Sequence, residues 1–246
     1  MAKFAVILPA AGRSSRFHDK HYKKQYAVLD NRAVWLISAE RFLNRDDVKQ
    51  IILVISPDDH EMFKMKFSAN VAILGIDVVN GGESRADSVA NALARVKADI
   101  DFVAVHDSAR PCLANEWIDR VFSMAEKTGA AMLAIPVVGT LKRVADDNTI
   151  LETVPRANLW EAQTPQVFRR EVLLDAYANR GDLQATDDAQ LVEQLGHAVT
   201  VVLGSPINLK ITTKEDLKFA AQALKALPKP KLAGPAHPFA DDDMWR

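Results

Sequence analysis

The stretch FAVILPAAG, residues 4–12, is the part of the sequence that most directly indicates the fold. Its first five residues are apolar, and Pro9 and Gly12 then interrupt the run. A short apolar run that ends at such residues is typical of a buried strand that leads into a loop. We therefore predict a strand over residues 4–8 and a loop directly after it.

Strand and helix patterns alternate along the rest of the chain. We predict strands within residues 48–55, 71–79, 101–105, 130–136 and 199–203, and helices over residues 33–43, 58–67, 84–96, 116–127, 186–195 and 213–224. This alternation indicates an α/β protein whose mostly parallel, twisted sheet carries helices on both faces. Ligands bind such sheets at the carboxyl ends of the strands.

Residues 136–158 break the alternation. Two β-compatible runs, residues 140–145 and 149–154, flank the turn sequence Asp146–Asp147–Asn148. Such a turn joins two antiparallel strands, so we predict a β-arm that projects from the main sheet. The proline-punctuated tail, residues 228–246, is expected to be poorly ordered.

Composition narrows the class of protein. The chain has 246 residues, a formal net charge of -1 and one cysteine, Cys112. Its length suits one domain, over residues 1–227, and its balanced charge argues against broad binding to nucleic acid or an anionic membrane. The apolar runs are too short for a signal peptide or for the ~20 residues of a membrane span. A lone cysteine rules out an internal disulfide framework, and a cytoplasmic location is expected.

The loop PAAGRSSRF, residues 9–17, is the first candidate for binding chemistry. Gly12 allows backbone N–H groups to surround phosphates, and Arg16 could contact them directly. The loop is neither a Walker A sequence nor a full GxGxxG pattern, and an ordinary turn explains it equally well. Lys23 and Lys24 follow as a possible clamp for a triphosphate, although each alone is more simply a solvated charge.

A second candidate is GGESRADSV, residues 81–89. The paired glycines allow a flat ligand, such as a nucleotide base, to approach the backbone. Ser84 and Asp87 are equally typical of a helix start. For Arg85 and Ser88, a binding role and a capping role remain open.

The segment HDSARP, residues 106–111, is a third candidate. An aspartate at the end of a strand, here Asp107, commonly holds Mg²⁺ or contacts a ribose. Arg110 could pair with an anionic substrate, whereas a structural role is favoured for His106. Lys210, between apolar residues of a strand-like segment, suggests an anionic centre because lysine is seldom buried.

Three polar residues flank the predicted arm. Thr140, Arg156 and Thr164 could shape a small phosphate site there. The basic residues of the arm are otherwise solvated charges.

Taken together and in order, these motifs carry a resemblance. PAAG…R, KQY, GG-x-x-RxDSV, VHDxARP, PxRxxLWxxQTPQxF, ATDDA and NxKIT occur over residues 4–224. The chain resembles the 2-C-methyl-D-erythritol 4-phosphate cytidylyltransferase family. The resemblance implies a Rossmann-like, three-layer nucleotidyltransferase fold, transfer of CMP from CTP to methylerythritol phosphate with release of pyrophosphate, and Mg²⁺ or another divalent cation as cofactor. It also implies a homodimer that forms through the β-arm.

The resemblance further assigns roles to particular positions. Residues implied to hold the nucleotide are Ala10, Ala11, Gly12, Gly82, Arg85, Ser88, Asp107 and Ser108. Arg16, Lys24 and Lys210 match the basic residues set against the phosphates, and Asp107 also matches the metal ligand. Residues implied to bind methylerythritol phosphate are Arg110, Thr140, Arg156 and Thr164, with the arm residues reaching the partner's site. Thr186 also lies in a family motif, but capping of the following helix is its simpler role.

Three positions depart from the family pattern. Ser14 stands where a second glycine is usual, Lys23 replaces a proline before KQY, and Gly139 replaces an aspartate before the arm threonine. The related ribitol-5-phosphate cytidylyltransferases share several of the motifs and remain an alternative. A non-catalytic nucleotide-binding module and a nicotinamide dehydrogenase are less consistent with the basic residues present.

Overall fold

A seven-stranded sheet forms the centre of the computed structural model, which describes residues 1–12, 14, 17, 23–183 and 185–228. Across the sheet the strands lie in the order β11-β7-β10-β6-β1-β4-β5. Their bounds are β1 Phe4–Ala10, β4 Val48–Ile55, β5 Asp77–Asn80, β6 Phe102–Val105, β7 Ala130–Pro136, β10 Trp160–Arg169 and β11 Thr200–Leu203. Strand β10 is antiparallel to β6 and β7, and the other neighbours in the sheet pair in parallel.

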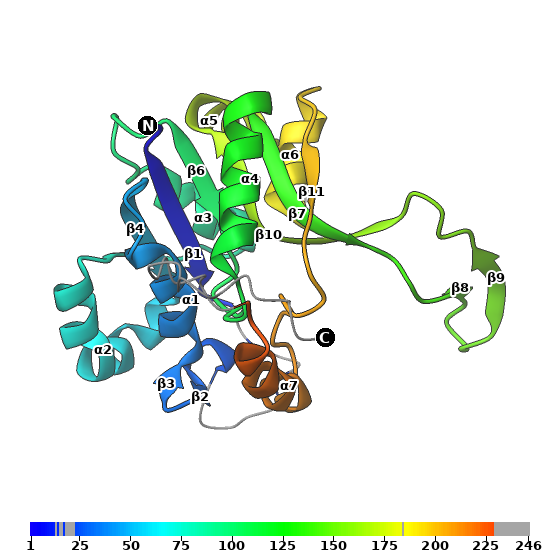
Figure 1. Cartoon of the computed structure of the whole chain (residues 1–246), viewed down its shortest axis with the longest axis horizontal. Coiled ribbons are helices and arrows are strands. Elements are labelled where there is room, and N and C mark those ends of the chain that lie inside the picture. Colours follow the sequence, from blue (N-terminus) through cyan, green and yellow to red (C-terminus); the bar gives the residue numbers. More distant parts are fainter. Residues whose placement is uncertain (13, 15–16, 18–22, 184, 229–246) are drawn as a thin grey trace, which may run out of the picture.

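Helices cover both faces of this sheet, as the alternation of patterns predicted (Figure 1). Helices α1 Val34–Leu43, α2 His60–Leu74 and α4 Asn115–Thr128 share one apolar cluster with the sheet. Helices α3 Arg85–Leu93, α5 Arg170–Ala178 and α6 Asp188–Gln194 share the cluster on the opposite face. A third cluster contains residues of α1 and of α7 Lys214–Lys225.

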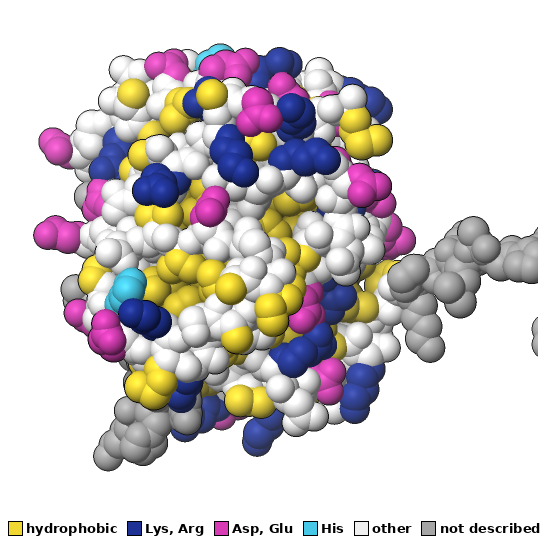
Figure 2. All heavy atoms as spheres, turned by 90° about the vertical axis from the view of Figure 1, so that its left-hand side faces the viewer, with side chains coloured by type: hydrophobic (Ala, Val, Ile, Leu, Met, Phe, Trp, Pro, Cys, Tyr) yellow, Lys and Arg dark blue, Asp and Glu magenta, His cyan; other side chains and the backbone are white. Residues whose placement is uncertain are grey.

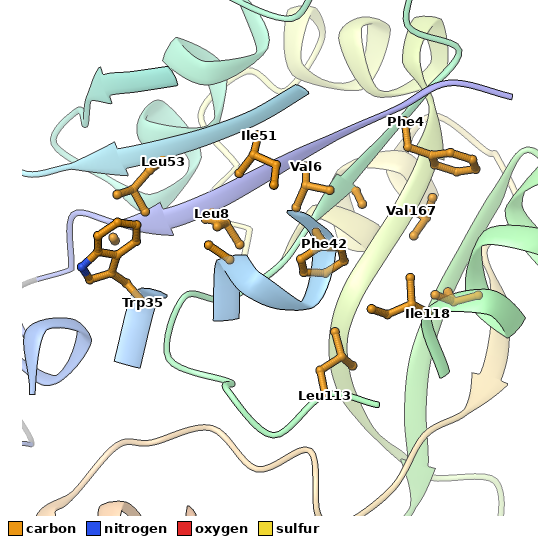
Figure 3. Packing of buried hydrophobic residues seen from close by; sticks show 14 of the residues in the cluster. Phe4, Val6, Leu8, Trp35, Phe42, Ile51, Leu53, Leu113, Ile118 and Val167 are labelled. Carbon is orange, nitrogen blue, oxygen red and sulfur yellow. The ribbon is translucent and has the colours of Figure 1, made fainter. Parts of the chain in front are cut away.

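Strand β1 explains why the opening stretch decides the fold. Successive side chains of a strand point to opposite faces, and all of residues 4–8 are fully buried. Phe4, Val6 and Leu8 enter the first cluster, where Figure 3 shows them on the same side as Phe42 of α1. Ala5 and Ile7 enter the second. A strand with two buried faces lies in the interior of a layered α/β fold.

The β-arm is the most extended feature of the molecule. Strands β8 Leu141–Val144 and β9 Ile150–Val154 form a two-stranded antiparallel sheet beyond the ends of β7 and β10. Figure 1 shows this hairpin well away from the main sheet, as predicted. The turn residue Asn148 has a φ of 66°, a conformation that Asn tolerates better than most residues. Most of the arm's side chains are exposed, including Val144, Ile150 and Leu151.

Several elements differ from the sequence-based prediction. Strand β10 and helix α5 were not predicted. Strand β10 does not have the pattern of a strand, because it contains Pro165 and the polar residues Gln163, Thr164 and Gln166. These three polar side chains are buried in the structure. Helix α2 extends to Leu74, beyond the predicted end at residue 67. The segment around Lys210 was predicted to be strand-like, which is wrong. It forms an irregular loop held by backbone contacts such as Ile211 N to Ala109 O, 2.9 Å.

Four short elements complete the structure. The short strands β2 Val28–Leu29 and β3 Arg32–Ala33 pair with each other. The single-turn 3-10 helix η2 Lys24–Tyr26 precedes β2, and η3 Pro57–Asp59 follows β4. The predicted disorder of the tail concerns residues that, apart from 228, lie outside the described part of the chain.

The surface carries charges of both signs. Figure 2 shows Lys and Arg side chains interspersed with Asp and Glu on one face of the molecule, in line with the net charge of -1. A helix long and apolar enough to cross a membrane is not found among the described residues.

Candidate active site

A cavity of about 730 Å³ opens at the carboxyl ends of β1, β4, β5 and β6. Because these strands are parallel, their ends and the loops that follow them meet at one edge of the sheet. The cavity is lined by Pro9, Ala10, Ala11, Gly12, Lys23, Lys24, Gln25, Ser56, Pro57, Asp58, Gly81, Gly82, Glu83, Ser84, Arg85, Ser88, Asp107, Ser108, Ala109 and Lys210. Residues from five separate sequence motifs therefore line one space.

The loop after β1 forms one wall of this cavity. A side chain at Gly12 would meet no heavy atom within 4 Å, so this position faces open space. Ser14 has a φ of 55°, a left-handed conformation that favours glycine. The family pattern has glycine at this position. Ser14 therefore differs from the pattern in its side chain, whereas its backbone keeps a conformation that glycine favours. Arg16, predicted to contact the triphosphate, lies outside the described residues.

The hydroxyl of Ser14 connects this loop to the basic segment. Its Oγ accepts a hydrogen bond from the backbone N of Lys24, at 3.2 Å, and donates to Oε1 of Gln25, at 3.1 Å. The Gln25 amide in turn donates to the carbonyl of Ala10, at 2.6 Å. The start of the segment with Lys24 is thus held against the loop after β1.

Lys23 and Lys24 have different surroundings, although both line the cavity. Nζ of Lys23 lies 2.8 Å from Oδ2 of Asp59, and the same oxygen accepts a hydrogen bond from the Tyr26 hydroxyl at 3.2 Å. Asp59 is buried at the start of α2. The ammonium of Lys23 therefore already has a carboxylate partner within the protein.

The glycine pair forms a second part of the cavity wall, which packs directly against the first loop. A Cβ at Gly81 would lie 2.5 Å from the Cβ of Ala11, and a Cβ at Gly82 would lie 2.4 Å from that of Asp87. Both glycines are therefore required by close packing of the protein on itself, whatever a ligand requires. Ser88 Oγ accepts a hydrogen bond from Gly82 N at 3.1 Å and donates to Ser84 O at 2.9 Å.

The start of α3 shows which of the two roles its residues play. Ser84 and Asp87 form a capping box, in which the side chain of each bonds to the backbone N of the other. The helix-start interpretation of these two residues is therefore confirmed. Ser88 and Arg85 take no part in this capping box, and both line the cavity.

Asp107 and Lys210 form the charged centre of the site. Nζ of Lys210 lies 2.8 Å from Oδ2 of Asp107, and Nε of Arg110 lies 3.5 Å from the same oxygen. Burial alone would raise the pKa of Asp107, but the positive charges of Lys210, Arg85 and Arg110 outweigh it and hold the pKa well below its usual range. Asp107 is therefore a carboxylate at neutral pH.

Behind Asp107, hydrogen bonds fix the backbone of the loop. Nε2 of the fully buried His106 lies 3.0 Å from the carbonyl of Arg110, which can only accept, so Nε2 carries the proton. Nδ1 then accepts from the Thr164 hydroxyl at 3.0 Å, and Thr164 Oγ1 accepts from Asp107 N at 3.1 Å. This chain agrees with the structural role favoured for His106.

Arg110 is also engaged behind the cavity. Its side chain is almost fully buried and donates to the carbonyls of Asn208, at 2.6 Å, and Ala162. It thereby joins the Asp107 loop to the segment that carries Lys210. Arg110 and Thr164 do not line the cavity. Both form hydrogen bonds with Asp107, which does line it.

The predicted site residues thus fall into distinct groups. Those that line the cavity are Ala10, Ala11, Gly12, Lys24, Gly82, Arg85, Ser88, Asp107, Ser108 and Lys210. Thr140 and Arg156 are exposed and do not line the cavity. Both belong to the arm, whose strands β8 and β9 lie well away from the main sheet (Figure 1). The roles of all these residues remain predictions.

Sequence analysis did not find several residues that shape the site. The capping prediction for Thr186 is wrong, because the neighbouring Asp187 accepts the hydrogen bond from Gln190 N and caps α6. The sequence marks Ser14 only as a departure from the family pattern, and it does not distinguish Gln25, which is buried beside the loop. A buried glutamine between two lysines is a weak signal, since nothing in the sequence indicates its burial.

The cavity also suits a divalent cation. Within the described ranges, no three His, Cys, Asp or Glu side chains are close enough to hold a metal by themselves. Magnesium in phosphate-transfer sites needs only one or two carboxylates, because substrate phosphates and water complete its shell. Asp107 is an ionised carboxylate at the cavity wall, so its chemistry fits.

Comparison with known proteins agrees with this geometry. The family described as 2-C-methyl-D-erythritol 4-phosphate cytidylyltransferase matches residues 4–226. The enzyme of this name from Rhodopirellula baltica is 43% identical over 234 residues, which cover 91% of this chain and 95% of that protein. The crystal structure of the Thermus thermophilus enzyme superposes with a TM-score of 0.75 at 30% identity, and covers 92% of this chain and 100% of its own.

A second solved structure gives the same result. The Francisella tularensis 2-C-methyl-D-erythritol 4-phosphate cytidylyltransferase has a TM-score of 0.75 at 31% identity, over 91% of this chain and 100% of its own. Both the sequence match and the structural match span nearly the whole length of each protein. The chain therefore belongs to the 2-C-methyl-D-erythritol 4-phosphate cytidylyltransferase family, with the α/β nucleotidyltransferase fold of that family.

Proposed function

We propose that this protein transfers CMP from CTP to 2-C-methyl-D-erythritol 4-phosphate. The products are 4-diphosphocytidyl-2-C-methyl-D-erythritol and pyrophosphate, and the reaction belongs to non-mevalonate isoprenoid precursor biosynthesis. The observation that carries the proposal is that Gly12, Lys24, Asp107 and Lys210, taken from separate motifs, all line one cavity. Family membership makes CTP and methylerythritol phosphate the expected substrates.

The two loop walls are suited to bind the nucleotide. Ala10, Ala11 and Gly12 on one side and Gly82 and Ser88 on the other offer small side chains and backbone groups. We assign the cytosine and its ribose to the space between them, with Ser108 at the ribose end. Backbone groups have fixed donors and acceptors, so they can select one base without flexible side chains.

The chemistry requires positioning more than proton transfer. The acceptor phosphate is already ionised at neutral pH and attacks the α-phosphorus of CTP in line. Negative charge then grows on the non-bridging oxygens and on the leaving pyrophosphate. Lys210 at the α-phosphate, with Lys24 and Arg16 at the β- and γ-phosphates, would stabilise that charge. Lys210 is held in place by its ion pair with Asp107.

Mg²⁺, or another divalent cation, is the cofactor of this proposal. Asp107 would hold it, and the bound cation would neutralise charge on the phosphate oxygens of CTP. Both ion pairs of Asp107 are made by Oδ2. A fixed, ionised carboxylate at this place would supply one oxygen ligand to the cation that accompanies the triphosphate.

For the acceptor we propose a site that two subunits share. Thr140 and Arg156 lie on the arm and would reach the partner's cavity, while Arg110 and Thr164 act from behind Asp107. The exposed apolar residues Val144, Ile150 and Leu151 on the arm would be covered in such a homodimer. Isologous pairing through one arm on each subunit gives a closed dimer.

We further propose a cytoplasmic location. Cys112 is a buried free thiol, and burial raises its pKa to about 12, so it stays protonated. Such a residue is a packing element in a reducing compartment. The net charge of -1 gives no reason to expect nucleic acid or membrane as a partner.

The decisive experiment supplies CTP, Mg²⁺ and one of two acceptors and measures pyrophosphate release. Methylerythritol phosphate is expected to support rapid release and ribitol 5-phosphate only slow release. The opposite preference would assign the protein to the ribitol-phosphate enzymes, and release with neither acceptor would indicate a nucleotide-binding module.

Replacing Lys24 by Met is expected to lower kcat by at least ~100-fold, as removal of one transition-state donor does. Lys23→Met provides the matched comparison, because Lys23 carries the same charge one residue earlier and also lines the cavity. Steady-state kinetics with both variants test the assignment. A greater loss for Lys23→Met would identify Lys23 as the phosphate clamp instead.

A further inference from the structure

Arg85 is the one cavity-lining residue at the start of α3 that also forms a long-range ion pair in the described part of the chain. Its Nη2 lies 2.6 Å from Oδ2 of Asp188, the first residue of α6. A second ion pair joins Asp87 of α3 to Arg180, which lies between α5 and α6. Asp188 does not line the cavity, so it reaches the cavity only through Arg85.

Besides Arg85, two further elements hold Asp188 in place, one through its carboxylate and one through its backbone. The residue is completely buried, and its Oδ1 accepts a hydrogen bond from the hydroxyl of Tyr177, on α5, at 2.5 Å. The side chain of Gln166, on β10, accepts hydrogen bonds from the backbone N of Asp188 at 3.0 Å and of Ala189 at 2.9 Å. Asp188 can therefore move little relative to the sheet.

A fixed carboxylate in turn fixes the guanidinium that it pairs with. Burial by itself lowers the pKa of Arg85, but the attraction of Asp188 and then of Asp107 raises it overall. The side chain of Arg85 is 29% exposed, and that of Asp188 is 0% exposed. The guanidinium thus meets a buried anion, while the partly exposed side chain also lines the cavity.

The guanidinium can only donate hydrogen bonds, so its partner in the cavity must be an acceptor oxygen. Nucleotides supply such oxygens on the base, the ribose and the phosphates. Holding a long, flexible arginine in place before the ligand arrives lowers the entropy lost on binding. A buried carboxylate is a costly way to do this unless its oxygens are hydrogen-bonded. Here Oδ1 of Asp188 accepts from Tyr177 and Oδ2 accepts from Arg85.

We infer that Asp188 and Tyr177 are positioning residues for the nucleotide, which hold the guanidinium of Arg85 against acceptor oxygens of CTP. The inference rests on the proposed function for the identity of the nucleotide. It goes beyond the assignment of Arg85 because neither Asp188 nor Tyr177 touches the cavity. The competing view is that the pair only ties α3 to α6.

Calorimetric titration of CTP in the presence of Mg²⁺, without acceptor, separates the two views. Asp188→Asn keeps the shape of the side chain and removes its charge, and it is expected to raise the Kd for CTP by ~10-fold. Tyr177→Phe removes only the hydroxyl and should raise the Kd by ~3-fold. The matched control Asp175→Asn removes an exposed carboxylate from the same region and should change the Kd by less than ~2-fold.

A double-mutant cycle shows whether the effect passes through Arg85. In an Arg85→Met background, Asp188→Asn is expected to cause no further rise in the Kd, because the group that it positions is gone. An equal rise in both backgrounds, or an unchanged Kd in Asp188→Asn, would overturn the inference. If the ion pair only stabilises the packing of α3 against α6, Asp188→Asn should lower the thermal midpoint without changing the Kd of the folded protein for CTP. If Asp188→Asn does not fold, Tyr177→Phe decides the question in the same two backgrounds.

Pyrophosphate release by the unaltered protein keeps this inference apart from the proposed function. CTP binding that depends on Asp188, without release from either acceptor, would refute the proposed function and support the inference. Normal pyrophosphate release, together with a Kd for CTP that does not change in Asp188→Asn, would support the proposed function and refute the inference. Absence of any CTP binding by the unaltered protein would refute both.

Discussion

At the scale of the residue, Ser14 shows how one side chain replaces another at a constrained position. Its φ of 55° costs a residue with a side chain roughly 1–2 kcal/mol relative to glycine. The hydroxyl offsets this through its hydrogen bonds with Lys24 N and Gln25 Oε1. Each such bond contributes about 1 kcal/mol. Serine is therefore tolerated because it is polar as well as small.

This balance predicts an unusual order of stability for two variants of Ser14. Ser14→Ala loses both hydrogen bonds and keeps the free-energy cost of the left-handed backbone conformation. Ser14→Gly also loses both hydrogen bonds, but it removes that cost. The glycine variant should therefore be the more stable of the two by about 1 kcal/mol. Urea unfolding of both proteins measures the difference, and an alanine variant at least as stable as the glycine variant would contradict the account.

His106 links a single buried residue to the pH dependence of the whole fold. Burial lowers its pKa to about 4, whereas an unfolded chain has a histidine pKa of about 6.5. Between these values the unfolded state binds a proton that the native state does not. The contribution of His106 to stability is therefore complete above about pH 6.5 and falls as the pH drops toward 4.

The slope of this dependence is predicted to be about 1.4 kcal/mol per pH unit in that window. His106→Gln should flatten the fall in the free energy of unfolding between pH 6.5 and 4.5. The control is His60→Gln, because His60 is half exposed at the start of α2. Equal slopes in the two variants would show that groups other than His106 control the acid unfolding.

At the scale of the element, the two loops of the cavity contain glycine for different reasons. Gly81 lies so close to Ala11 that any side chain would force the loops apart, whereas Gly12 faces open space. The first is needed to fold the cavity wall. The second is needed only if a ligand comes close to it.

Alanine at each position should separate stability from binding. Gly81→Ala is expected to lower the free energy of unfolding by about 1–3 kcal/mol, as overpacking does. Gly12→Ala should change it by less than about 0.5 kcal/mol, as a surface substitution does, and should raise the KM for CTP. Chemical denaturation and steady-state kinetics provide the two measurements. A Gly12→Ala enzyme with an unchanged KM would show that CTP does not approach this loop.

Strand β10 shows why sequence patterns miss some elements. Its residues Gln163, Thr164 and Gln166 are polar and buried, and each bonds to a segment distant in sequence. Periodicity of apolar residues cannot reveal such a strand, because its partners are found only after the chain has folded. The parallel strands β1 and β4 were predicted because their apolar runs are buried on both faces.

At the scale of the whole molecule, the β-arm raises the question of how many chains make one site. Arg156, on the arm, and Lys210, at the cavity, lie on different parts of the same chain. If the arm serves the partner's cavity, a hybrid dimer of Arg156→Ala and Lys210→Ala chains contains one intact site and one doubly altered site. Such hybrids, isolated by a different tag on each chain, should have about half the activity of the unaltered dimer.

The parental variants provide the comparison for this experiment. Each homodimer of Arg156→Ala or Lys210→Ala should be nearly inactive, because every site then lacks one residue. A hybrid no more active than its parents would place both residues in one chain's site. Sedimentation of the unaltered protein as a monomer at micromolar concentration would exclude the shared site altogether.

The sequence by itself determined the layered α/β fold, the arm and the cavity residues that follow strands. Apolar runs and turn residues are local signals, and parallel strands bring their carboxyl ends together whatever the loops contain. Only the tertiary structure decided that Lys23 pairs with Asp59, that Arg110 and Thr164 lie behind Asp107, and that Asp188 pairs with Arg85. The physical reason is that charge pairing and burial depend on distances between residues up to about a hundred positions apart, which no local pattern records.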